Sequence, residues 1–343
     1  MLTKTSLPSI SVVIPTLNSG SVLEKCLKSI SAQVYPKNKV EIIIVDGGST
    51  DSIINIAKKF HAKIVHNTLK TAEAGKAVGV KEAKNELIAL IDSDNILPNT
   101  HWFSDMVVPF KDKEIILSEP IRYTYRKKDP YLTRYFALLG MNDPICLFIG
   151  NYDRYSYVTN RWTGLNFPEE NKRDYLKITL DHEPIPTIGA NGTIIRKDIL
   201  RSTLKNSNYL FDIDILLKII RQKGGVKIAK VNTGIVHTFV ESDMKKFFKK
   251  QLRRVNDMSF HKAKMNREIN WESSFLPKIL LFILECFLIF PILIQMLIGF
   301  IRKPDSAWLF HPIACYSTLF VYLYGWLKGK IIPQESSRKS WKQ

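Results

Sequence analysis

Two aspartates at the end of an apolar run are well suited to holding a metal ion. Asp92 and Asp94 follow Leu87–Ile91, a run of strand length, and are separated by a single serine. Their negative charges repel, so a divalent cation shared with a diphosphate would explain why they lie so close together. The alternative is that Asp94 or Asn95 makes an Asx turn or caps a helix. The pair alone leaves both interpretations open.

Polar loops also follow two earlier apolar runs. Val12–Asn18 ends in a proline turn and a polar loop, and Asp46 begins the sequence DGGSTD. Two glycines let the backbone approach a ligand closely, and a carboxylate at a strand end can accept hydrogen bonds from a base or a ribose. An ordinary strand–turn–helix connection explains the segment from Asp46 to Asp51 equally well.

The segments that would position these residues alternate between two patterns. Continuous apolar runs predict strands at 11–14, 41–45, 63–65 and 87–91. Stretches with helical apolar spacing lie between them, at 21–32, 51–60 and 72–85. This order indicates an α/β fold with a mostly parallel sheet and helices on both faces. The loops that follow the strands then share one edge, where ligands bind in such sheets.

Charge and cysteine content limit the class of protein. The chain has 343 residues with 50 Lys and Arg against 32 Asp and Glu, a net charge of +18, which requires an anionic partner. Nucleic acid, anionic lipid and a phosphorylated substrate would each meet that requirement. Four cysteines lie far apart without a Cys-x-x-Cys pair, which argues against a zinc module or a disulfide scaffold: Cys26, Cys146, Cys286 and Cys315.

The composition becomes strongly basic near residue 241. Nine basic residues and one acid lie at 245–267. The apolar residues there step by four, four and three, which predicts one face of a helix: Met244, Phe248, Leu252 and Val255. A basic amphipathic helix is typical of a membrane surface, and a solvated helix packed on the domain is the alternative. No aromatic platform is interleaved with the charges, so we expect no nucleic acid partner.

Two apolar stretches follow, Ile279–Ile301 and Ser306–Leu327. Each reaches the roughly 20 residues that a spanning helix requires, but Pro291 and Pro312 interrupt them, so an interfacial or re-entrant course is the alternative. We therefore expect an α/β domain at 1–240 and a basic amphipathic segment at 241–275. Two hydrophobic membrane-associated helices would follow at 276–330, and a basic tail at 331–343.

Together the three loop motifs resemble those of the inverting glycosyltransferases of family 2, which have the GT-A fold. The resemblance covers about residues 9–237 and is strongest in VIPTLN, VDGGSTD and LIDSD. It implies that 1–240 is a catalytic domain for a nucleotide-diphosphate sugar. Asp46 would bind the nucleobase, Asp92 the ribose and metal, and Asp94 a divalent metal, Mn²⁺ or Mg²⁺. The resemblance adds four residues to the nucleotide site: Pro15, Thr16, Asn18 and Lys76.

Ser19 stands where many family members have Glu, and a solvated helix lysine is as good an interpretation of Lys76. Downstream, IGANGTIIR resembles the acceptor-side segment of the family and contributes Gly189, Ala190 and Asn191. By the same resemblance, His237 stands where some GT-A enzymes supply a further metal ligand. A structural histidine is the alternative.

Two more motifs are partial matches. Phe211–Leu217 resembles a Glu-Asp signature whose Asp is the general base. Asp214 falls at that Asp, Ile213 replaces the Glu, and Asp212 is the rival candidate. QLRRV resembles the Gln-x-x-Arg-Trp signature of processive synthases: it keeps Gln251 and Arg254 on the acceptor side, with Val in place of Trp.

The resemblance, together with the apolar C-terminal stretches, implies a membrane-associated inverting glycosyltransferase with its catalytic domain on the cytoplasmic side. It would move a sugar from a UDP-sugar, or alternatively a GDP-sugar, to a lipid-linked or glycan acceptor by single displacement. A hydroxyl acceptor would give its proton to Asp214, whereas a polyprenyl phosphate is already ionised. The alternatives are a processive polysaccharide synthase and a non-catalytic, membrane-anchored scaffold on the same fold.

Overall fold

A computed structural model describes residues 7–205, 207–264, 267–269 and 271–331, and most of the basic tail at 331–343 lies outside them. A twisted sheet runs through the larger part of the molecule in the order β3-β2-β1-β4-β9-β6-β10-β8-β7, with β5 paired to β10. The strands are β1 Ile10–Thr16, β2 Val40–Asp46, β3 Lys63–His66, β4 Leu87–Ile91, β5 Asn95–Ile96, β6 Ile115–Tyr123, β7 Glu169–Asn171, β8 Tyr175–Leu180, β9 Asn191–Arg196 and β10 Val226–His237.

The first four strands confirm the prediction from the apolar runs. β1 pairs in parallel with β2 and β4, and β2 pairs in parallel with β3. The rest of the sheet differs from the expected parallel order. β9 lies between β4 and β6 and is antiparallel to both, and β8 is antiparallel to β10. The sheet is therefore mixed, because segments after β6 return along its edge and centre in the opposite direction.

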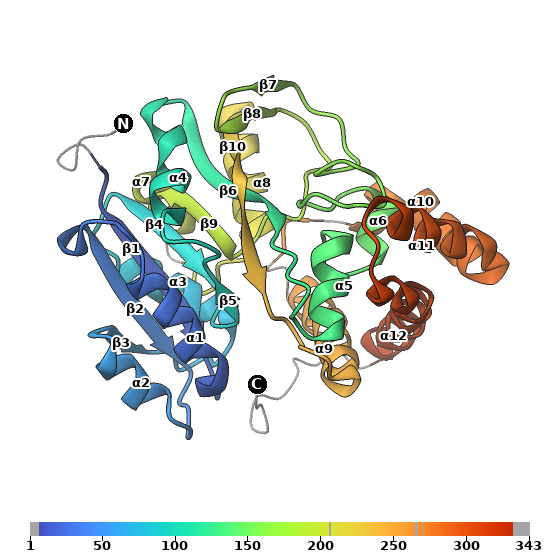
Figure 1. Ribbon diagram of the computed structural model, residues 1–343, viewed down its shortest axis with the longest axis horizontal. Coiled ribbons are helices and arrows are strands. Elements are labelled where there is room, and N and C mark those ends of the chain that lie inside the picture. Colours follow the sequence, from blue (N-terminus) through green and yellow to red (C-terminus); the bar gives the residue numbers. More distant parts are fainter. Residues whose placement is uncertain (1–6, 206, 265–266, 270, 332–343) are drawn as a thin grey trace.

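Helices cover both faces of the sheet, as expected, and a separate group lies beside it (Figure 1). The helices are α1 Gly20–Ser31, α2 Ile53–Lys59, α3 Ala72–Glu82, α4 Trp102–Val107, α5 Tyr131–Leu139, α6 Ile145–Ile149, α7 Lys197–Leu204, α8 Asp212–Lys223, α9 Met244–Ala263, α10 Trp271–Leu288, α11 Phe290–Arg302 and α12 His311–Ile331. Short 3₁₀ turns occur at Lys37–Lys39, Val108–Lys111 and Ser306–Phe310.

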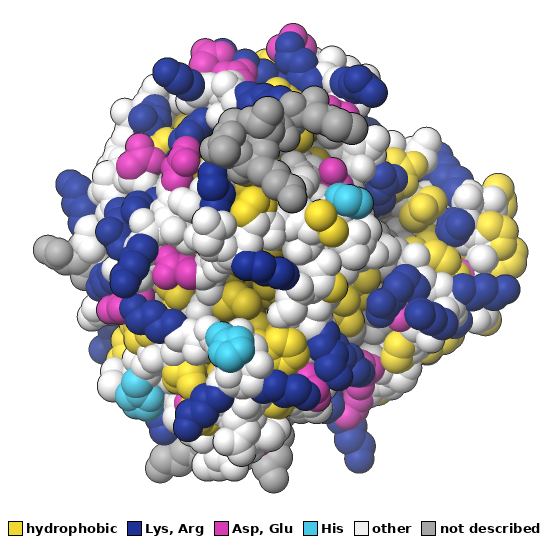
Figure 2. Space-filling view, turned by 60° about the vertical axis from the view of Figure 1, so that its left-hand side comes forward, with side chains coloured by type: hydrophobic (Ala, Val, Ile, Leu, Met, Phe, Trp, Pro, Cys, Tyr) yellow, Lys and Arg dark blue, Asp and Glu magenta, His cyan; other side chains and the backbone are white. Residues whose placement is uncertain are grey.

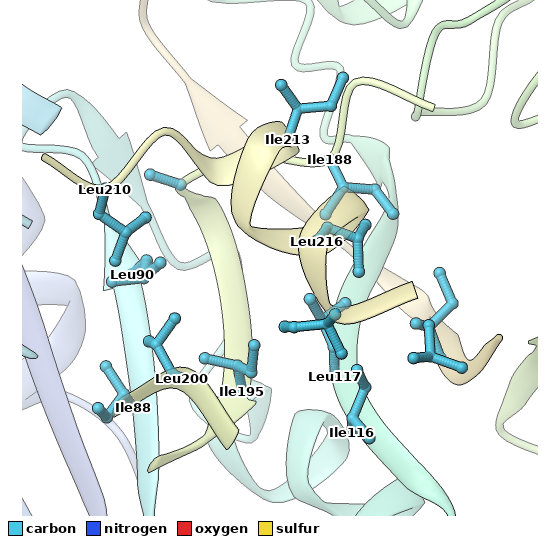
Figure 3. Close-up of a cluster of buried hydrophobic side chains, with 14 of the residues drawn as sticks. Ile88, Leu90, Ile116, Leu117, Ile188, Ile195, Leu200, Leu210, Ile213 and Leu216 are labelled. Carbon is cyan, nitrogen blue, oxygen red and sulfur yellow. The ribbon is translucent and has the colours of Figure 1, made fainter. Parts of the chain in front are cut away.

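Side chains alternate across the strands, so each face has its own core. Val12 and Ile14 of β1 pack with α1, α2 and α4, whereas Val13 packs on the other face with α3, α7 and α8. Figure 3 shows the second core, in which Ile213 of α8 lies among apolar side chains that include Ile188. Ile213 is 9% exposed, so this position, a Glu in the resembling signature, is part of the core here.

A third core joins the C-terminal helices to segments of the α/β domain. Its buried side chains come mainly from α5, α6, α9, α10, α11, α12, the segment after β10 and the 3₁₀ turn at Ser306–Phe310. In Figure 1, α10, α11 and α12 lie on the side of the molecule opposite α1 and α2. α5 and α6 lie within 1–240, so the predicted boundary near residue 240 does not separate two cores.

The first apolar stretch is not the single helix that was predicted. It divides at Ile289, whose φ of 56° breaks the helical path, into α10 and α11. Among the described residues, no single helix is both long and apolar enough to cross a membrane. Phe275–Leu288 and Phe290–Arg302 reach the required length and apolar composition only as a pair, and the two helices are bent by 90° relative to each other.

The predicted apolar face of α9 is correct only in part, since Val255 is buried and Met244 packs against the third core. Phe248 is 40% exposed, whereas Phe247, Lys250 and Gln251 are buried along with the predicted Val255. The helix is rotated from the expected orientation because its polar side chains meet buried partners in the α/β domain.

Figure 2 shows Lys and Arg side chains spread over one face of the molecule, with hydrophobic side chains gathered on the part that projects to the right.

Candidate active site

A buried carboxylate, Asp94, is held between two distant parts of the chain. It follows β4, and its backbone oxygen accepts hydrogen bonds from the amide and the hydroxyl of Thr238, both at 3.0 Å. Its Oδ1 lies 3.4 Å from Nε2 of His237 at the end of β10. Its Oδ2 lies 3.3 Å from Nζ of Lys250 in α9. The structure thus brings together Asp94 and His237, as predicted, and adds Lys250.

The two aspartates after β4 have opposite electrostatic environments. Burial, together with the negative charge of Asp94, raises the pKa of Asp92 to about 6. Burial alone would raise the pKa of Asp94 too, but the neighbouring His237 and Lys250 outweigh it and lower that pKa below its ordinary value. The basic neighbours of Asp94 therefore favour its ionised form, which is the form that binds a metal ion.

The donor atoms fit a divalent ion that is completed by substrate. Adjacent ligands on an octahedral ion with bonds of about 2.1 Å lie roughly 3 Å apart, close to the 3.4 Å between Asp94 Oδ1 and His237 Nε2. Across the described residues, no three His, Cys, Asp or Glu side chains form a ready metal cage. Oxygen ligands from a bound diphosphate would fill the remaining positions, which is how Mg²⁺ is commonly bound.

These residues line a small pocket of about 150 Å³, here called the polar pocket. Its walls come from the loop after β1, the segment before α3, the end of β4, the end of β10 and α9. Seven of the predicted site residues line it: Pro15, Thr16, Asp92, Asp94, Asn191, His237 and Arg254. The carboxyl ends of β1, β4 and β10 therefore meet at one site, as an open α/β sheet requires.

Two predicted nucleotide ligands, Asn18 and Asp46, form hydrogen bonds with the loop after β2. The Asp46 carboxylate accepts hydrogen bonds from the amides of Gly48 and Ser49, each at 3.0 Å, and from the Ser49 hydroxyl at 2.5 Å. Oδ1 of Asn18 accepts a hydrogen bond from the amide of Thr50 at 2.9 Å. Asn18 and Asp46 therefore shape the loops after β1 and β2 and do not line the polar pocket.

Lys76 is neither solvated nor in the polar pocket. Its Nζ forms an ion pair with Oδ2 of Asp212 at the start of α8, and its side chain is only 6% exposed. Burial alone would lower the pKa of Lys76, but the charges of Asp212, Glu73 and Asp92 outweigh it and raise the pKa. The pair thus ties α3 to α8 and adds a positive charge near Asp92.

The two candidate bases, Asp212 and Asp214, are both engaged and both lie outside the polar pocket. The Asp214 carboxylate forms an ion pair with Arg267 and accepts hydrogen bonds from the amides of Glu268 and Ile269, at 3.0 and 2.9 Å. It therefore holds the segment after α9 against α8. Asp212 is committed to Lys76. A catalytic role for either remains a prediction.

The predicted acceptor-side residues separate into two groups. Gly189, Ala190 and Gln251 do not line the polar pocket, and Gln251 is fully buried in α9. Asn191 and Arg254 do line it. Nη1 of Arg254 donates to Oε1 of Gln251 at 2.9 Å, so Gln251 orients the arginine.

Two site residues were not singled out from the sequence, Lys250 and Asn142. Lys250 is one of the nine basic residues at 245–267, yet it is 7% exposed and its ammonium reaches Asp94. Asn142, which follows α5, lies beside His237, with Oδ1 3.1 Å from Nδ1. Neither carries a distinctive local pattern. The one available signal for Lys250 was its place directly before Gln251.

The sequence model described as "Glycosyl transferase family 2" matches residues 11–204, more than half of the chain. The chain therefore belongs to glycosyl transferase family 2. The match confirms the resemblance seen in the loop motifs and the enzyme class that it implies, a glycosyltransferase.

Curated relatives match part of the chain. "Glycosyltransferase AglE" of Haloferax volcanii is 26% identical over 143 residues, 40% of this chain and 47% of that protein. "Glycosyltransferase GlyG" of Streptococcus pneumoniae is 33% identical over 140 residues, 39% of this chain and 44% of that protein. The chain thus spans less than half the length of these relatives.

A solved structure shares the fold over almost the whole chain. The mannosyltransferase PcManGT from Pyrobaculum calidifontis, in complex with GDP-Man and Mn²⁺, has a TM-score of 0.53 and is 14% identical. The similarity covers 94% of this chain and 88% of that one. At this identity it shows a common fold and nothing more.

Proposed function

We propose that this chain is a metal-dependent, inverting glycosyltransferase that moves a sugar from a nucleotide-diphosphate sugar to a lipid-linked or glycan acceptor. The observation that carries the proposal is the meeting of Asp92, Asp94 and His237 in one pocket of a family 2 chain. UDP is the favoured donor nucleotide and GDP is the alternative. GDP-Man and Mn²⁺ occupy the mannosyltransferase of similar fold.

The side chains of the polar pocket have matching chemical roles. Asp94 and His237, with Asp92, would hold a divalent ion together with diphosphate oxygens. Such an ion stabilises the negative charge that develops on a departing diphosphate. Lys70, Arg253 and Arg254 also line the pocket and place further positive charge around the phosphates. A single in-line displacement at the anomeric carbon then inverts its configuration.

We also propose that the enzyme works on the cytoplasmic face of a membrane, where the C-terminal helices lie in the interface. Large apolar side chains on α10 and α11 are mostly exposed, with Phe287 at 81% and Ile301 at 76%. A contiguous exposed apolar surface of this kind marks an interaction site. Phe287→Asp with Ile301→Asp should release the protein from vesicles that contain anionic lipid, measured by co-sedimentation, while the exposed control Val34→Asp should not.

The test of the enzymatic proposal is donor binding. UDP-sugars and GDP-sugars are titrated calorimetrically against the purified chain with and without Mn²⁺, and donor hydrolysis is followed in parallel. We expect Mn²⁺-dependent binding of one donor class, and loss of turnover by roughly a hundredfold or more in Asp94→Ala. Asp181→Ala, outside the polar pocket, is the control. If no donor binds under any condition, the scaffold interpretation replaces this proposal.

A further inference from the structure

A second cavity, much larger than the polar pocket, lies among α9, α10, α12 and the segment 141–153. Its volume is about 650 Å³, within the range of roughly 300–1,000 Å³ for small-molecule sites. Its lining is dominated by apolar side chains of α10 and α12, among them Ile279, Ile283, Leu319, Leu323 and Trp326. We call it the apolar cavity.

The apolar cavity and the polar pocket share a wall. Asn142, Asn191 and Arg254 line both. The side-chain amides of Asn142 and Asn191 donate to the hydroxyl of Tyr123, at 3.2 and 3.3 Å, and Arg254 donates to the backbone oxygen of Asn142 at 3.1 Å. These hydrogen bonds fix a polar boundary between the two spaces. A molecule with an apolar body in the cavity would thus have its polar end beside Asp92 and Asp94.

The charges of the cavity favour an anion at that boundary. Its two carboxylates already have partners: Asp143 accepts a hydrogen bond from the Tyr322 hydroxyl at 2.6 Å, and Asp153 lies 2.5 Å from the Arg154 guanidinium. Burial also raises the pKa of Asp143. The guanidinium of Arg254 stands at the shared wall, where it donates to Asn142 and Gln251 and lies over the ring of Phe239. Within the described part of the chain it forms no salt bridge with a carboxylate. An arginine in this setting is suited to a phosphate.

The cavity also opens toward the outer surface of the C-terminal helices. Four of its lining side chains are about half exposed: Leu276 at 53%, Leu280 at 56%, Leu323 at 45% and Trp326 at 47%. A hydrocarbon chain could therefore enter from the same apolar surface that we propose faces the membrane, and its polar end would be the part that reaches Arg254.

Among the described residues, the groups that could act as a base beside the acceptor already have partners, and His237 lies against Asp94. The carboxylates that line either space are Asp92 and Asp94, which serve the donor, and Asp143 and Asp153, which are engaged. Asp212 and Asp214 line neither space. A hydroxyl acceptor loses a proton during transfer, whereas a phosphate is already ionised at neutral pH.

On the basis of the function proposed above, we propose that the apolar cavity binds the hydrocarbon chain of a long-chain lipid monophosphate, and that its phosphate is the sugar acceptor. A phosphate oxygen forms a bond to the anomeric carbon while the bond from that carbon to the donor diphosphate breaks. The electron pair leaves with the nucleoside diphosphate, and no proton has to move. The product is a lipid-phosphate-sugar diester.

The experiment compares farnesyl monophosphate with farnesol and with inorganic phosphate as ligands of the full chain. Binding is measured by calorimetry, transfer by extraction of labelled sugar into an organic phase, and Mn²⁺-dependent donor binding on the same samples. Two variants of α10 form a matched pair: Leu280→Glu, which lines the cavity and is 56% exposed, and Leu284→Glu, which does not line it and is 52% exposed.

We expect farnesyl monophosphate to bind at least roughly tenfold more tightly than farnesol or inorganic phosphate, because it alone engages both Arg254 and the cavity. Leu280→Glu should weaken that binding at least tenfold and Leu284→Glu should leave it unchanged, with donor binding intact in both. Equal binding of the phosphate and the alcohol, or equal effects of the two variants, would overturn the cavity assignment while donor binding still upholds the enzyme. Absence of donor binding in the wild type would overturn both.

Discussion

The ammonium group of Lys250 lies 3.3 Å from Oδ2 of Asp94, although the two residues are 156 positions apart in the chain. The same Nζ donates to the backbone oxygen of Phe239 at 2.8 Å. The interaction fastens α9 to the end of β4, and it places a fixed cation at the carboxylate expected to hold the metal.

Replacing Lys250 with Met should therefore strengthen Mn²⁺ binding. The ammonium repels a divalent ion and occupies one oxygen of Asp94, and charges this close interact strongly even at an effective dielectric of about 20. We expect the Mn²⁺ affinity to rise roughly tenfold, measured by electron paramagnetic resonance of free Mn²⁺. Lys245→Met, at an exposed position of the same helix, should leave the affinity unchanged. Weaker binding in Lys250→Met would show that the lysine supports the metal site.

Asp212→Asn and Asp214→Asn should each keep most of the transfer to a lipid phosphate. Neither carboxylate lines the polar pocket, and an ionised acceptor needs no base. We expect the turnover number to fall by less than roughly tenfold, whereas removal of a general base costs about 10²–10⁴-fold. Asp214→Asn should also lower the urea midpoint, because Arg267 loses its partner. A loss of a hundredfold in turnover for one variant would identify that residue as the base and favour a hydroxyl acceptor.

The strands at the start of the chain could be predicted because each contains a continuous apolar run. β1 and β4 are buried along their whole length, whereas β3 is partly exposed. Their parallel order follows from the intervening helices. The direction of β9 could not be predicted, because it depends on pairing with β4 and β6, whose paired residues lie about a hundred and nearly eighty residues earlier in the chain. A local sequence pattern indicates whether a strand is buried, but it does not indicate which distant strand pairs with it.

The loop aspartates could be predicted for the same reason, since they follow recognisable strands. The roles of Asp212 and Asp214 could not. Both occupy the first turn of α8, and only their tertiary partners, Lys76 and Arg267, distinguish them. The role of Lys250 could not be predicted for a different reason. A buried lysine in a basic helix has the same local sequence pattern as an exposed lysine, and only the tertiary contact with Asp94 distinguishes Lys250.

The buried ion pairs of Glu119 with Arg154 and Lys230 should contribute strongly to the free energy of unfolding. Glu119 of β6 is fully buried, lies 2.6 Å from Nη1 of Arg154 and also pairs with Lys230 of β10. Glu119→Gln leaves the Lys230 ammonium without its charge partner, and we expect the free energy of unfolding to fall by roughly 3 kcal/mol in urea titrations. Glu114→Gln, which breaks exposed pairs with Lys177 and Lys227, is the control and should change little. Equal midpoints for the two variants would contradict this role.

Stability should also depend on the protonation of His311 at the start of α12. Its Nδ1 accepts a hydrogen bond from the Tyr135 hydroxyl at 2.8 Å, and its Nε2 donates to Gln295 at 3.0 Å. Burial lowers the pKa of His311 to about 3. Since the unfolded chain has the ordinary value of about 6.5, the stabilisation is complete above that pH and declines as the pH falls from 6.5 toward 3.

His311→Gln removes the titrating group, so its urea midpoint should fall less between pH 7.5 and pH 5 than that of the wild type. The exposed His182→Gln variant is the control and should follow the wild type. Parallel curves for His311→Gln and the wild type would show that other groups cause the acid sensitivity.

The wall shared by the two cavities has a thermodynamic consequence. Because Asn142, Asn191 and Arg254 face both spaces, whatever fills one of them alters the surroundings of the other. By linkage, any factor by which the donor changes the affinity for a ligand in the apolar cavity must equal the factor by which that ligand changes the affinity for the donor. Under the functions proposed above, the sugar donor and the lipid acceptor would share one coupling energy, and replacing Asn142, Asn191 or Arg254 is expected to change it.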